Sequence, residues 1–414
     1  MNTAHTVKKD KVKQEKSYAT TECDKVGEIA VQYGFTVIKP PHIKPEHISK
    51  AKQFKDFDYY SDAEEKAALT EWYINERKET ESQPIAIHYK KPLHRQEKVA
   101  SPGTRREGGK KPNQEVYGFE VMGSGRSTSE ALVMKCVLAV LGDLGYKDLY
   151  VDINSIGDKE SISKFERELS GYFRKHRHDL TSKLRQEMRK NYYSILADKS
   201  EEAKDFRKNA PQPIAMLSDI ARAHFKEVLE CMEAFDIAYK INPSVLSNKL
   251  YASYTVFEIR QTPTTVKEQA ATDGTLLAYG YRYNHLAKKL GAKREIPSIG
   301  VTLFVKKQPS LSKKVIIKNI KRPKFYLVQL GPSAKLKALN VVEMLRKEKI
   351  PVYHSITKDK ITGQLSGAEY MRATHVLVMG QKEAMENTII VRNIANREQE
   401  TVPLPKLAEF LKKL

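Results

Sequence analysis

The sequence predicts an α+β protein in which a large part with antiparallel-type strands is followed by a smaller α/β part. Its 414 residues are enough for two or three domains, and a hydrophobic content of 40% can supply a core. Up to about residue 310, candidate strands and helices are mixed without regular alternation, which is typical of α+β architecture. After a basic segment, short strands and helices alternate regularly, which favours a small parallel or mixed α/β domain.

The N-terminal region begins with a polar, lysine-rich stretch, and we expect residues 1–17 to be a flexible basic tail. Apolar residues then recur at helical spacing from Cys23 to Gly34, where the glycine suits a helix end. Phe35–Ile38 is predicted to be a short strand that two following prolines stop. The charged stretch 50–82 is predicted to be helical.

The middle of the chain opens with a loop rich in basic residues, Gly and Pro over residues 98–115, which we expect to be mobile. Tyr117–Met122 and Leu149–Ile153 are predicted strands, and Ser129–Leu144 is a strongly amphipathic helix between them. A turn is expected after the second strand, and a long, charged helical region follows over Ser161–Arg189.

The rest of the large part is predicted to contain another helix, Leu217–Phe235, and a sheet region that Tyr239–Ile241 opens. Further strands are expected at 251–259, 275–283 and 297–306, with a helix near 284–290. We interpret the basic segment 313–324 as a linker. The smaller part is then predicted to have strands at 325–330, 351–354, 374–379 and 389–393 and helices at 334–347, 361–373 and 404–414.

The charge balance indicates an anionic partner. The chain carries 72 Lys+Arg against 51 Asp+Glu, a net charge of +21, and clustered cations are what phosphate contacts require. Nucleic acid is therefore the leading candidate, with a general lysine bias as the alternative. No apolar run approaches the length that crosses a bilayer, so no membrane is expected. Three widely spaced cysteines fit neither a disulfide framework nor a zinc site, which favours a cytoplasmic protein.

Two motifs resemble a known family. Thr255–Glu258 is similar to the end of the histidine-binding motif of class II histidyl-tRNA synthetases, and Asp152–Asp158 is similar to that family's INSIGD segment. The order of segments resembles the family from about residue 20 to the C-terminus. The resemblance implies a class II aminoacyl-tRNA synthetase core over 18–312, an antiparallel sheet flanked by helices. It also implies a helical insertion at about 160–210 and an anticodon-binding-like α/β domain over 325–414.

Other segments extend the resemblance. Gly34–Pro41 looks like the family's motif 1, which implies a homodimer. Tyr279–Asn284 looks like the second histidine motif, and Pro297–Lys307 resembles motif 3. Residues 325–414 contain LGPSAK, a GQL segment and VLVMG, which are similar to the anticodon-binding domain. In the family, the anticodon-binding domain binds tRNA, so the resemblance implies tRNA or another RNA as partner.

The same comparison indicates a degenerate site. The family's essential arginine and aspartate fall at Ser247 and Leu250, and Lys307 replaces the arginine that holds the γ-phosphate. Tyr281 replaces a glycine that leaves room for substrate, and Asn284 replaces an aspartate. The segment expected to contact the amino acid amine is reduced to Gln83–Tyr89, QPIAIHY. Adenylation needs positive charge where negative charge develops, and arginine supplies it with a planar fork that lysine lacks.

The resemblance predicts three sets of site residues and no metal site. Arg95, Glu97 and Lys307 are the catalytic candidates. Glu258, Tyr279, Arg282 and Tyr283 are the substrate-binding candidates, although Glu258 could be a sheet-edge acid and Arg282 a solvent-facing strand residue. The RNA-binding candidates are Arg105, Arg106, Lys110, Lys111, Lys358 and Lys360. Asn154, Gly157 and Asp158 are expected to shape a turn and cap a helix, and His88 to be an ordinary strand residue.

Three functions follow as hypotheses. The leading one is a histidyl-tRNA synthetase-like protein that binds tRNA or other RNA, with aminoacylation lost or strongly reduced. The first alternative is an active, divergent histidine–tRNA ligase, which would use ATP and Mg²⁺. The second alternative is a regulatory subunit of ATP phosphoribosyltransferase. That family usually lacks an anticodon-binding domain, so residues 325–414 argue against it.

Overall fold

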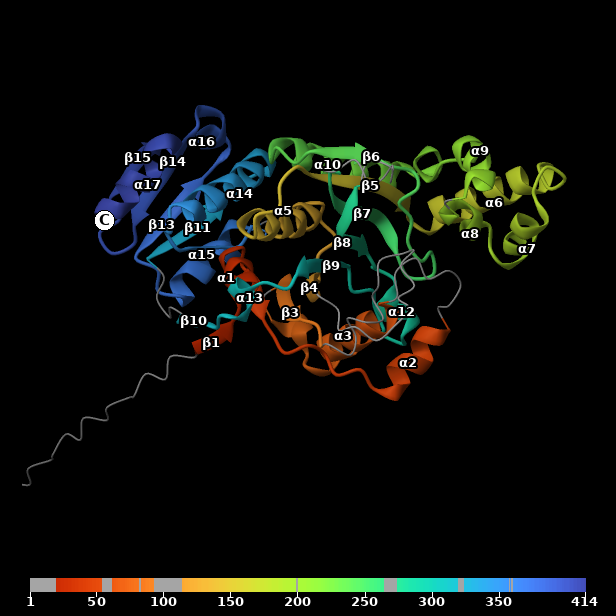
Figure 1. The fold of residues 1–414 in the computed structure, drawn as a ribbon. Coiled ribbons are helices and arrows are strands. Elements are labelled where there is room, and N and C mark those ends of the chain that lie inside the picture. The colour runs from red at the N-terminus through yellow and green to blue at the C-terminus, as the bar shows by residue number, and fades with distance from the viewer. Residues whose placement is uncertain are drawn as a thin grey trace, which may run out of the picture.

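An eight-stranded sheet forms the centre of the molecule. The computed structural model describes residues 20–53, 62–81, 83–92, 114–198, 200–263, 274–318, 324–356, 358 and 360–414. Figure 1 shows the sheet with the C-terminal part at one end and a group of helices at the other. Among the helices in these ranges, none has the length and apolarity needed to span a bilayer.

The strands of this sheet are mostly antiparallel. In spatial order they are β2 (Thr36–Val37), β3 (Ile85–Lys90), β4 (Gln114–Met122), β9 (Ser298–Lys306), β8 (Thr275–Arg282), β7 (Ser253–Gln261), β5 (Leu149–Gly157) and β6 (Tyr239–Ile241). Only the two outermost pairs described, β2 with β3 and β5 with β6, are parallel. The strands predicted at 117–122, 251–259, 275–283 and 297–306 are confirmed with small shifts, whereas β3 was expected only at His88, without bounds.

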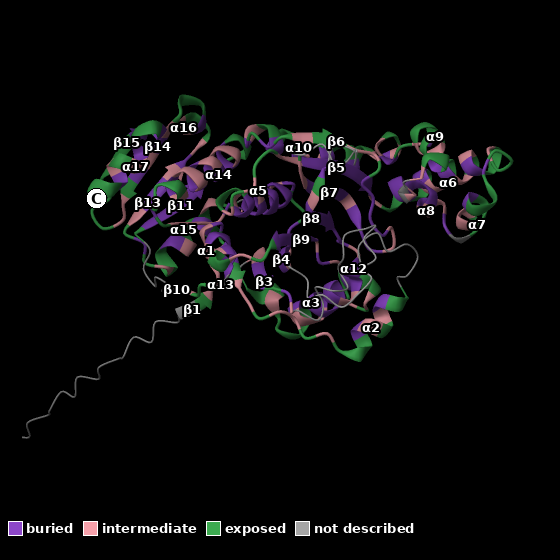
Figure 2. Cartoon of the chain, viewed as in Figure 1, coloured by how far each residue is buried: buried purple, intermediate pink, exposed green. Residues whose placement is uncertain are grey.

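One face of the sheet, which we call the core face, is covered by α1 (Lys25–Gln32), α5 (Thr128–Asp143) and α10 (Asp219–Ala234). Side chains alternate along each strand, so Phe119, Phe257 and Val301 all point to this face and pack with the helices. Helix α5 is buried along most of its length (Figure 2). The helix predicted from its amphipathic pattern is therefore confirmed.

The opposite face, which we call the tyrosine face, carries Tyr279, Tyr281 and Tyr283. Helix α3 (Ala63–Asn75) packs on it and is itself contacted by α2 (Pro45–Lys52), α12 (Leu286–Lys289) and the short η1 (Lys78–Thr80). Toward the far end of the sheet lie the helices between β5 and α10: α6 (Lys159–Lys175), α7 (Ser182–Lys190), α8 (Tyr192–Ala197), α9 (Glu201–Asn209) and η2 (Pro213–Met216). The single helical region predicted over Ser161–Arg189 is thus two helices.

The expected turn after Ile153 is wrong in its extent, because strand β5 continues to Gly157. The Asn154 side-chain amide donates to the Val245 carbonyl at 3.0 Å, so it holds a neighbouring loop. Gly157 adopts φ +72° at a bulge in the β5–β7 pairing. Asp158 caps α6 by accepting from the Ser161 amide at 3.0 Å, and Ser218, the cap of α10, donates to it at 2.6 Å.

The predicted linker at 313–324 contains a strand. Within it β10 (Val315–Lys318) pairs with β1 (Thr20–Cys23) in an antiparallel two-stranded sheet, and α13 (Pro309–Ser312) precedes it. The prediction missed this because the strand is short and flanked by lysines, and its pairing partner is far away in the sequence, at the N-terminal end of the described chain. The tail at 1–17 lies outside the described residues.

The C-terminal part is a mixed five-stranded sheet with helices on both faces. Its elements are β11 (Phe325–Gln329), α14 (Pro332–Lys347), β12 (Val352–His354), α15 (Ile361–Tyr370), β13 (His375–Met379), α16 (Gln381–Glu386), β14 (Thr388–Asn393), β15 (Gln399–Pro403) and α17 (Leu404–Lys413). Helices α14, α16 and α17 pack on one face and α15 on the other. The predicted α/β alternation is confirmed, and α16 and β15 were missed.

Helix α14 joins the C-terminal part to the centre. One continuous hydrophobic cluster contains residues of α1, α5 and α14. Polar contacts reinforce it: Arg346 binds Asp143 of α5 through two nitrogens, at 2.8 and 3.1 Å, and contacts Glu343 at 2.7 Å. The hydroxyl of Tyr33, the residue that follows α1, donates to the same Glu343. The two parts are therefore held together by both apolar packing and directional ionic contacts.

Replacing Arg346 by Ala should lower the free energy of unfolding by about 1–3 kcal/mol, because its partners lose a nearly buried guanidinium. Urea denaturation measures the change. The matched control is Lys347→Ala, which removes a neighbouring exposed cation and should have little effect. Equal stability of the two variants would contradict the proposed contribution of Arg346.

Candidate functional site

The structure separates the predicted substrate-binding residues. Tyr279 and Tyr283 lie on the tyrosine face, while Arg282 points to the core face, because successive side chains on a strand alternate. Glu258 pairs directly with Tyr279 across β7 and β8, so it belongs to the tyrosine face. The four residues therefore do not converge on one ligand.

Arg282 is fully buried and its donors are bound within the chain. Its Nε donates to Glu130 Oε1 at 2.7 Å, and Nη2 forms an ion pair with the other oxygen of Glu130. Nη1 donates to the Ser124 carbonyl at 2.7 Å and Nη2 to the Arg126 carbonyl at 3.1 Å. The expectation of a solvent-facing Arg282 is thus wrong, and this arginine fixes the start of α5 to β8.

Glu130 is the centre of this network on the core face. Besides Arg282 it accepts from Thr255 at 3.3 Å and contacts His224 Nε2 at 2.8 Å. Burial alone would raise the pKa of Glu130, but Arg282 and His224 outweigh burial and lower the pKa to about 2. The carboxylate is therefore ionised, and its charge balances the buried guanidinium.

The tyrosine face carries a second buried network, which we call the Lys66 cluster: Asp62, Lys66, Glu120, Tyr281 and Tyr283. Lys66 of α3 forms an ion pair with Glu120 Oε1 of β4, and the Tyr283 hydroxyl donates to Glu120 Oε2 at 2.7 Å. The Tyr281 hydroxyl donates to Asp62, the residue before α3. The Lys66 ammonium lies 5.6 and 5.2 Å from the Tyr281 and Tyr283 ring centres.

A second lysine strengthens the same contact between α3 and the sheet. Lys91, which follows β3, lies 2.9 Å from Glu65 of α3 and donates to the Thr302 hydroxyl at 3.0 Å. Tyr89 donates its hydroxyl to Glu65 as well. Burial raises the pKa of Glu65, but Lys91 and Lys66 outweigh it and lower the pKa. These charged side chains are as buried as the apolar core. Because they pair with each other across the contact, they hold α3 on the sheet.

Sequence reasoning missed the Lys66 cluster. The stretch 50–82 was predicted only as a charged helical region, and charged helices are usually solvated. One signal was present: Asp62, Glu65 and Lys66 have the i, i+3, i+4 spacing that places side chains on one helix face. The alternate tyrosines 279, 281 and 283, two in β8 and one just after it, were the matching signal on the sheet.

Glu258 is engaged by a cation of its own strand. Arg260 Nε donates to Glu258 at 2.8 Å, and the same nitrogen lies 3.4 Å from Asp152 of β5. Lys240 of β6 also lies 3.4 Å from Asp152. Strand β7 is internal to the sheet, so the alternative that Glu258 is a sheet-edge acid is wrong. His88, an ordinary residue of β3 as expected, is buried, and burial lowers its pKa to about 4.

The remaining predicted residues are scattered. Lys307 is exposed just after β9, whereas Ser247 is buried. Lys358 is half-buried and Lys360 exposed, both just before α15. The other candidates, Arg95, Glu97, Arg105, Arg106, Lys110 and Lys111, lie outside the described residues. Among the described residues, no group of three or more His, Cys, Asp or Glu could hold a metal ion.

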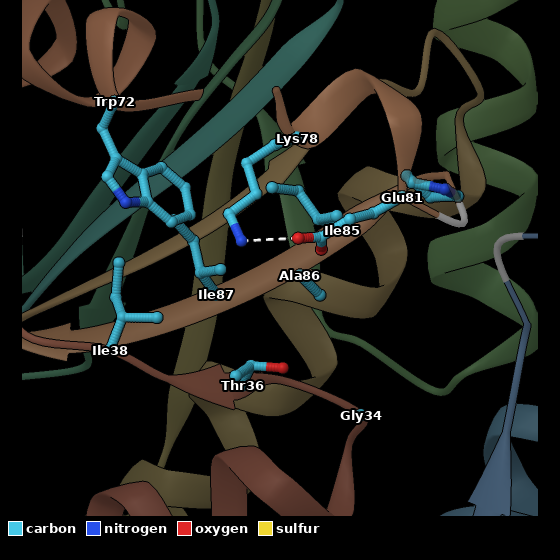
Figure 3. A pocket seen from close by; sticks show the side chains of 10 residues that line it. Gly34, Thr36, Ile38, Trp72, Lys78, Glu81, Ile85, Ala86 and Ile87 are labelled. Atoms are coloured by element: carbon cyan, nitrogen blue, oxygen red, sulfur yellow. Dashed lines mark hydrogen bonds and ion pairs between the residues drawn. The ribbon is translucent and has the colours of Figure 1, made fainter. Parts of the chain in front are cut away.

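A cavity of about 300 Å³ lies at the β2 edge of the sheet, in the segment that resembles motif 1. Figure 3 shows Trp72, Ile38 and Ile87 on its apolar side, while Lys78 and Glu81 form an ion pair across its rim. The cavity is separate from the Lys66 cluster, and helix α3 is the one described element that contributes to both.

Comparisons with known proteins agree with this architecture. Residues 324–414 match the family described as "Anticodon binding domain". The structure of apo histidyl-tRNA synthetase from S. aureus has a TM-score of 0.50 at 20% identity, and covers 94% of this chain and 93% of that one. The antiparallel sheet with its helices and the second, C-terminal sheet define a class II aminoacyl-tRNA synthetase fold, as predicted.

Sequence relatives specify the family. A histidine–tRNA ligase from Halothermothrix orenii is 31% identical over 337 residues, 80% of this chain and 76% of the relative. One from Thermosynechococcus vestitus is 30% identical over 290 residues, 70% of this chain and 66% of the relative. The chain belongs to the class II histidyl-tRNA synthetase-like family, which confirms the predicted resemblance.

Replacing Glu130 by Gln should lower the free energy of unfolding by about 3–5 kcal/mol, because Arg282 would stay buried without its counter-charge. The folded pKa of about 2 lies below the ordinary value of 4.5. The stabilisation from this carboxylate is therefore complete above pH 4.5 and is lost as the pH falls to about 2. Urea denaturation at several pH values measures both effects.

The control for this prediction is Glu230→Gln, which neutralises an exposed carboxylate of α10 and should cost little. The difference between wild type and the Glu130 variant should shrink across the acid window. A difference that stays constant from pH 5 to pH 2 would contradict the role given to the Glu130 charge.

Proposed function

We propose that this chain is a histidyl-tRNA synthetase-like protein that binds tRNA or other RNA and has lost or strongly reduced aminoacylation. The observation that carries the proposal is the Lys66 cluster: helix α3 and two tyrosines fill the face on which the two histidine-motif strands, β7 and β8, present their side chains. Tyr281 stands where the family pattern has a glycine, and it is buried against Asp62.

Electrostatics support the same proposal. Among the described residues, the histidine-motif positions that the family pattern uses for anionic substrates either lack the arginine or hold one that is already neutralised. Ser247 stands in place of the essential arginine, and Arg282 is bound to Glu130. Loss of one preorganised contact of this kind costs about 3 kcal/mol, or about 100-fold in rate. Several such losses together would remove useful activation.

ATP and Mg²⁺ would be needed only by an active ligase, and the described residues fit them poorly. Two buried acids of the tyrosine face, Glu120 and Glu258, are bound by Lys66 and Arg260. Lys307 is exposed, and it supplies a positive charge without the planar guanidinium with which an arginine binds two oxygens at once. The proposed function therefore involves neither ATP nor Mg²⁺.

RNA binding is supported by the C-terminal match and by charge. The anticodon-binding match spans 324–414, and the whole chain carries +21. Phosphate contacts supply most of the affinity of such surfaces. We further propose a cytoplasmic homodimer formed at the β2 edge, where Gly34–Pro41 resembles motif 1 and the apolar cavity of Figure 3 lies.

An active, divergent ligase is the alternative, and identity to curated histidine–tRNA ligases over most of the chain favours it. The regulatory subunit of ATP phosphoribosyltransferase is a second alternative. The anticodon-binding match at 324–414 argues against it, because that resemblance implies a domain such subunits usually lack. Both alternatives share the fold, so activity assays must distinguish them.

Purified wild-type protein should show no histidine-dependent ATP–pyrophosphate exchange above background, because Ser247 replaces the essential arginine and Glu130 neutralises Arg282. The assay includes an active histidine–tRNA ligase as positive control. Exchange in the wild type that disappears in both Lys307→Ala and Glu258→Ala would establish an active ligase with a rebuilt site and would sink the proposal.

Replacing Lys358 and Lys360 together by Ala should weaken tRNA binding about tenfold and lower the slope of log affinity against log salt by about 2, because two phosphate contacts are lost. Fluorescence titration at several salt concentrations measures both quantities. The control, Lys226→Ala with Lys347→Ala, removes two exposed cations from α10 and α14. Equal weakening in both double variants would mean that Lys358 and Lys360 make no special contribution.

A further inference from the structure

A second cavity lies where helix α14 of the C-terminal part meets helix α5 of the centre. Its volume is about 490 Å³, which is within the range of small-molecule sites. Residues of α5 and α14, of the turn after α10 and of the start of β5 line it. Helix α5 covers the core face of the sheet, so this cavity is distinct from the tyrosine face and from the cavity at the β2 edge.

The wall formed by α5 and β5 is apolar. Leu138, Ala139 and Leu149 pack against the core but are only partly buried, and Ile237 beside them is buried. Their remaining apolar surface faces a hollow whose rim is charged. An apolar group placed in this hollow would remove that surface from water, which is favourable.

Gly142 keeps the cavity open. It lies in the last turn of α5, on the same side of the helix as Lys135 and Leu138. A Cβ atom at Gly142 would meet no other part of the described chain within 4 Å. Glycine is less favourable than alanine in a helix, and the packing here does not require it. The missing side chain therefore leaves free space at the mouth of the cavity.

Lys135 supplies an ammonium with donors to spare. Its Nζ donates to the Phe235 carbonyl at 2.9 Å and lies 6.0 Å from the centre of the Phe235 ring. Burial lowers the pKa of Lys135, and the nearby Glu343 offsets burial only in part. Lys135 forms no ion pair with any described residue, and an ammonium has three donors. Two N–H donors of a half-buried cation are thus left for a ligand.

The carboxylates at the cavity are matched by other groups. Glu343 and Asp143 both accept from Arg346. Lys347 is 71% exposed and lies 3.6 Å from Glu343, so it adds a second cation at the rim. Asp236 is exposed, and water can solvate it. The group whose requirement is unmet is the ammonium of Lys135, and an anion meets that requirement.

We propose that the cavity between α5 and α14 binds a small amphipathic carboxylate, with its charged group at Lys135 and its apolar body against Leu138 and Leu149. The ligand class follows from the chemistry: the ammonium requires an anion, and the apolar wall requires a hydrocarbon part. Because α5 belongs to the centre and α14 to the C-terminal part, the bound carboxylate bridges the two parts.

The site goes beyond the proposed function, because none of its residues is among the candidates for substrate or RNA binding. Carboxylate binding is measured without RNA, ATP or histidine. A protein that fails to bind tRNA could still possess the site, and a protein that binds tRNA could lack it. The two proposals therefore fail through different experiments.

The test is a titration of the full chain with probes that share a phenyl ring and a three-carbon chain, followed by ligand-observed NMR. 3-Phenylpropionate should bind saturably. The neutral 3-phenylpropanamide should bind about tenfold more weakly, because it cannot form a charge-assisted hydrogen bond with Lys135. The cation 3-phenylpropylammonium should bind no better than the amide.

Two variants test the location. Gly142→Phe fills the cavity, and Lys135→Met removes the ammonium but keeps most of the side chain. Each should weaken 3-phenylpropionate binding about tenfold or more. The matched controls should bind like wild type: Gly171→Phe, at an exposed glycine of α6 with equally open surroundings, and Lys226→Met, at an exposed lysine of α10.

Circular dichroism and the Tm establish that each variant is folded. Gly142→Phe and Lys135→Met change different atoms, so either folded variant suffices for the comparison. The proposal is overturned if 3-phenylpropionate does not bind the wild type, or if the folded variants bind it as tightly as their controls. Equal binding of the carboxylate and the ammonium probe overturns it as well.

Discussion

The ion pair between Lys66 and Glu120 is the contact on which the tyrosine face depends. Moving two charges out of water costs several kcal/mol each, so the pair persists only because further groups complete it. Tyr283 donates to the second oxygen of Glu120, and the two tyrosine rings face the ammonium. Lys91 repeats the arrangement with Glu65 and Thr302. Helix α3 is therefore fixed over the sheet face by buried charges, because separating any of these pairs would leave a charge buried without its partner.

The pleat of the sheet places a second ionic network behind the first. Because neighbours on a strand face opposite ways, Arg282 lies under α5 while Tyr281 and Tyr283 lie under α3. The core-face network ties β8 to α5 and α10 through Glu130 and His224. One strand that resembles a substrate-binding motif is thereby used for packing on both faces. This is how a fold can keep a family's strands and give its binding residues structural roles.

The C-terminal part is joined to this centre through α14, with Arg346 between Glu343 and Asp143. Continuous apolar packing from α1 and α5 into α14 makes the anticodon-binding-like part an extension of the core. A surface for RNA on this part would consequently be held at a set position relative to the central sheet.

The sequence by itself determined the fold class, the order of most elements and the family, because local periodicity and short motifs carry that information. Strand and helix patterns predicted α5, β4 and the alternation after residue 324. Only the tertiary structure decided that Arg282 is buried against Glu130, that β1 pairs with β10, and that Lys66 lies among tyrosines. Those outcomes depend on partners far apart in the chain. A charged residue looks solvated in a sequence until its distant counter-charge is placed beside it, and that placement is set by the packing of α3 and α5 on the two faces of one sheet.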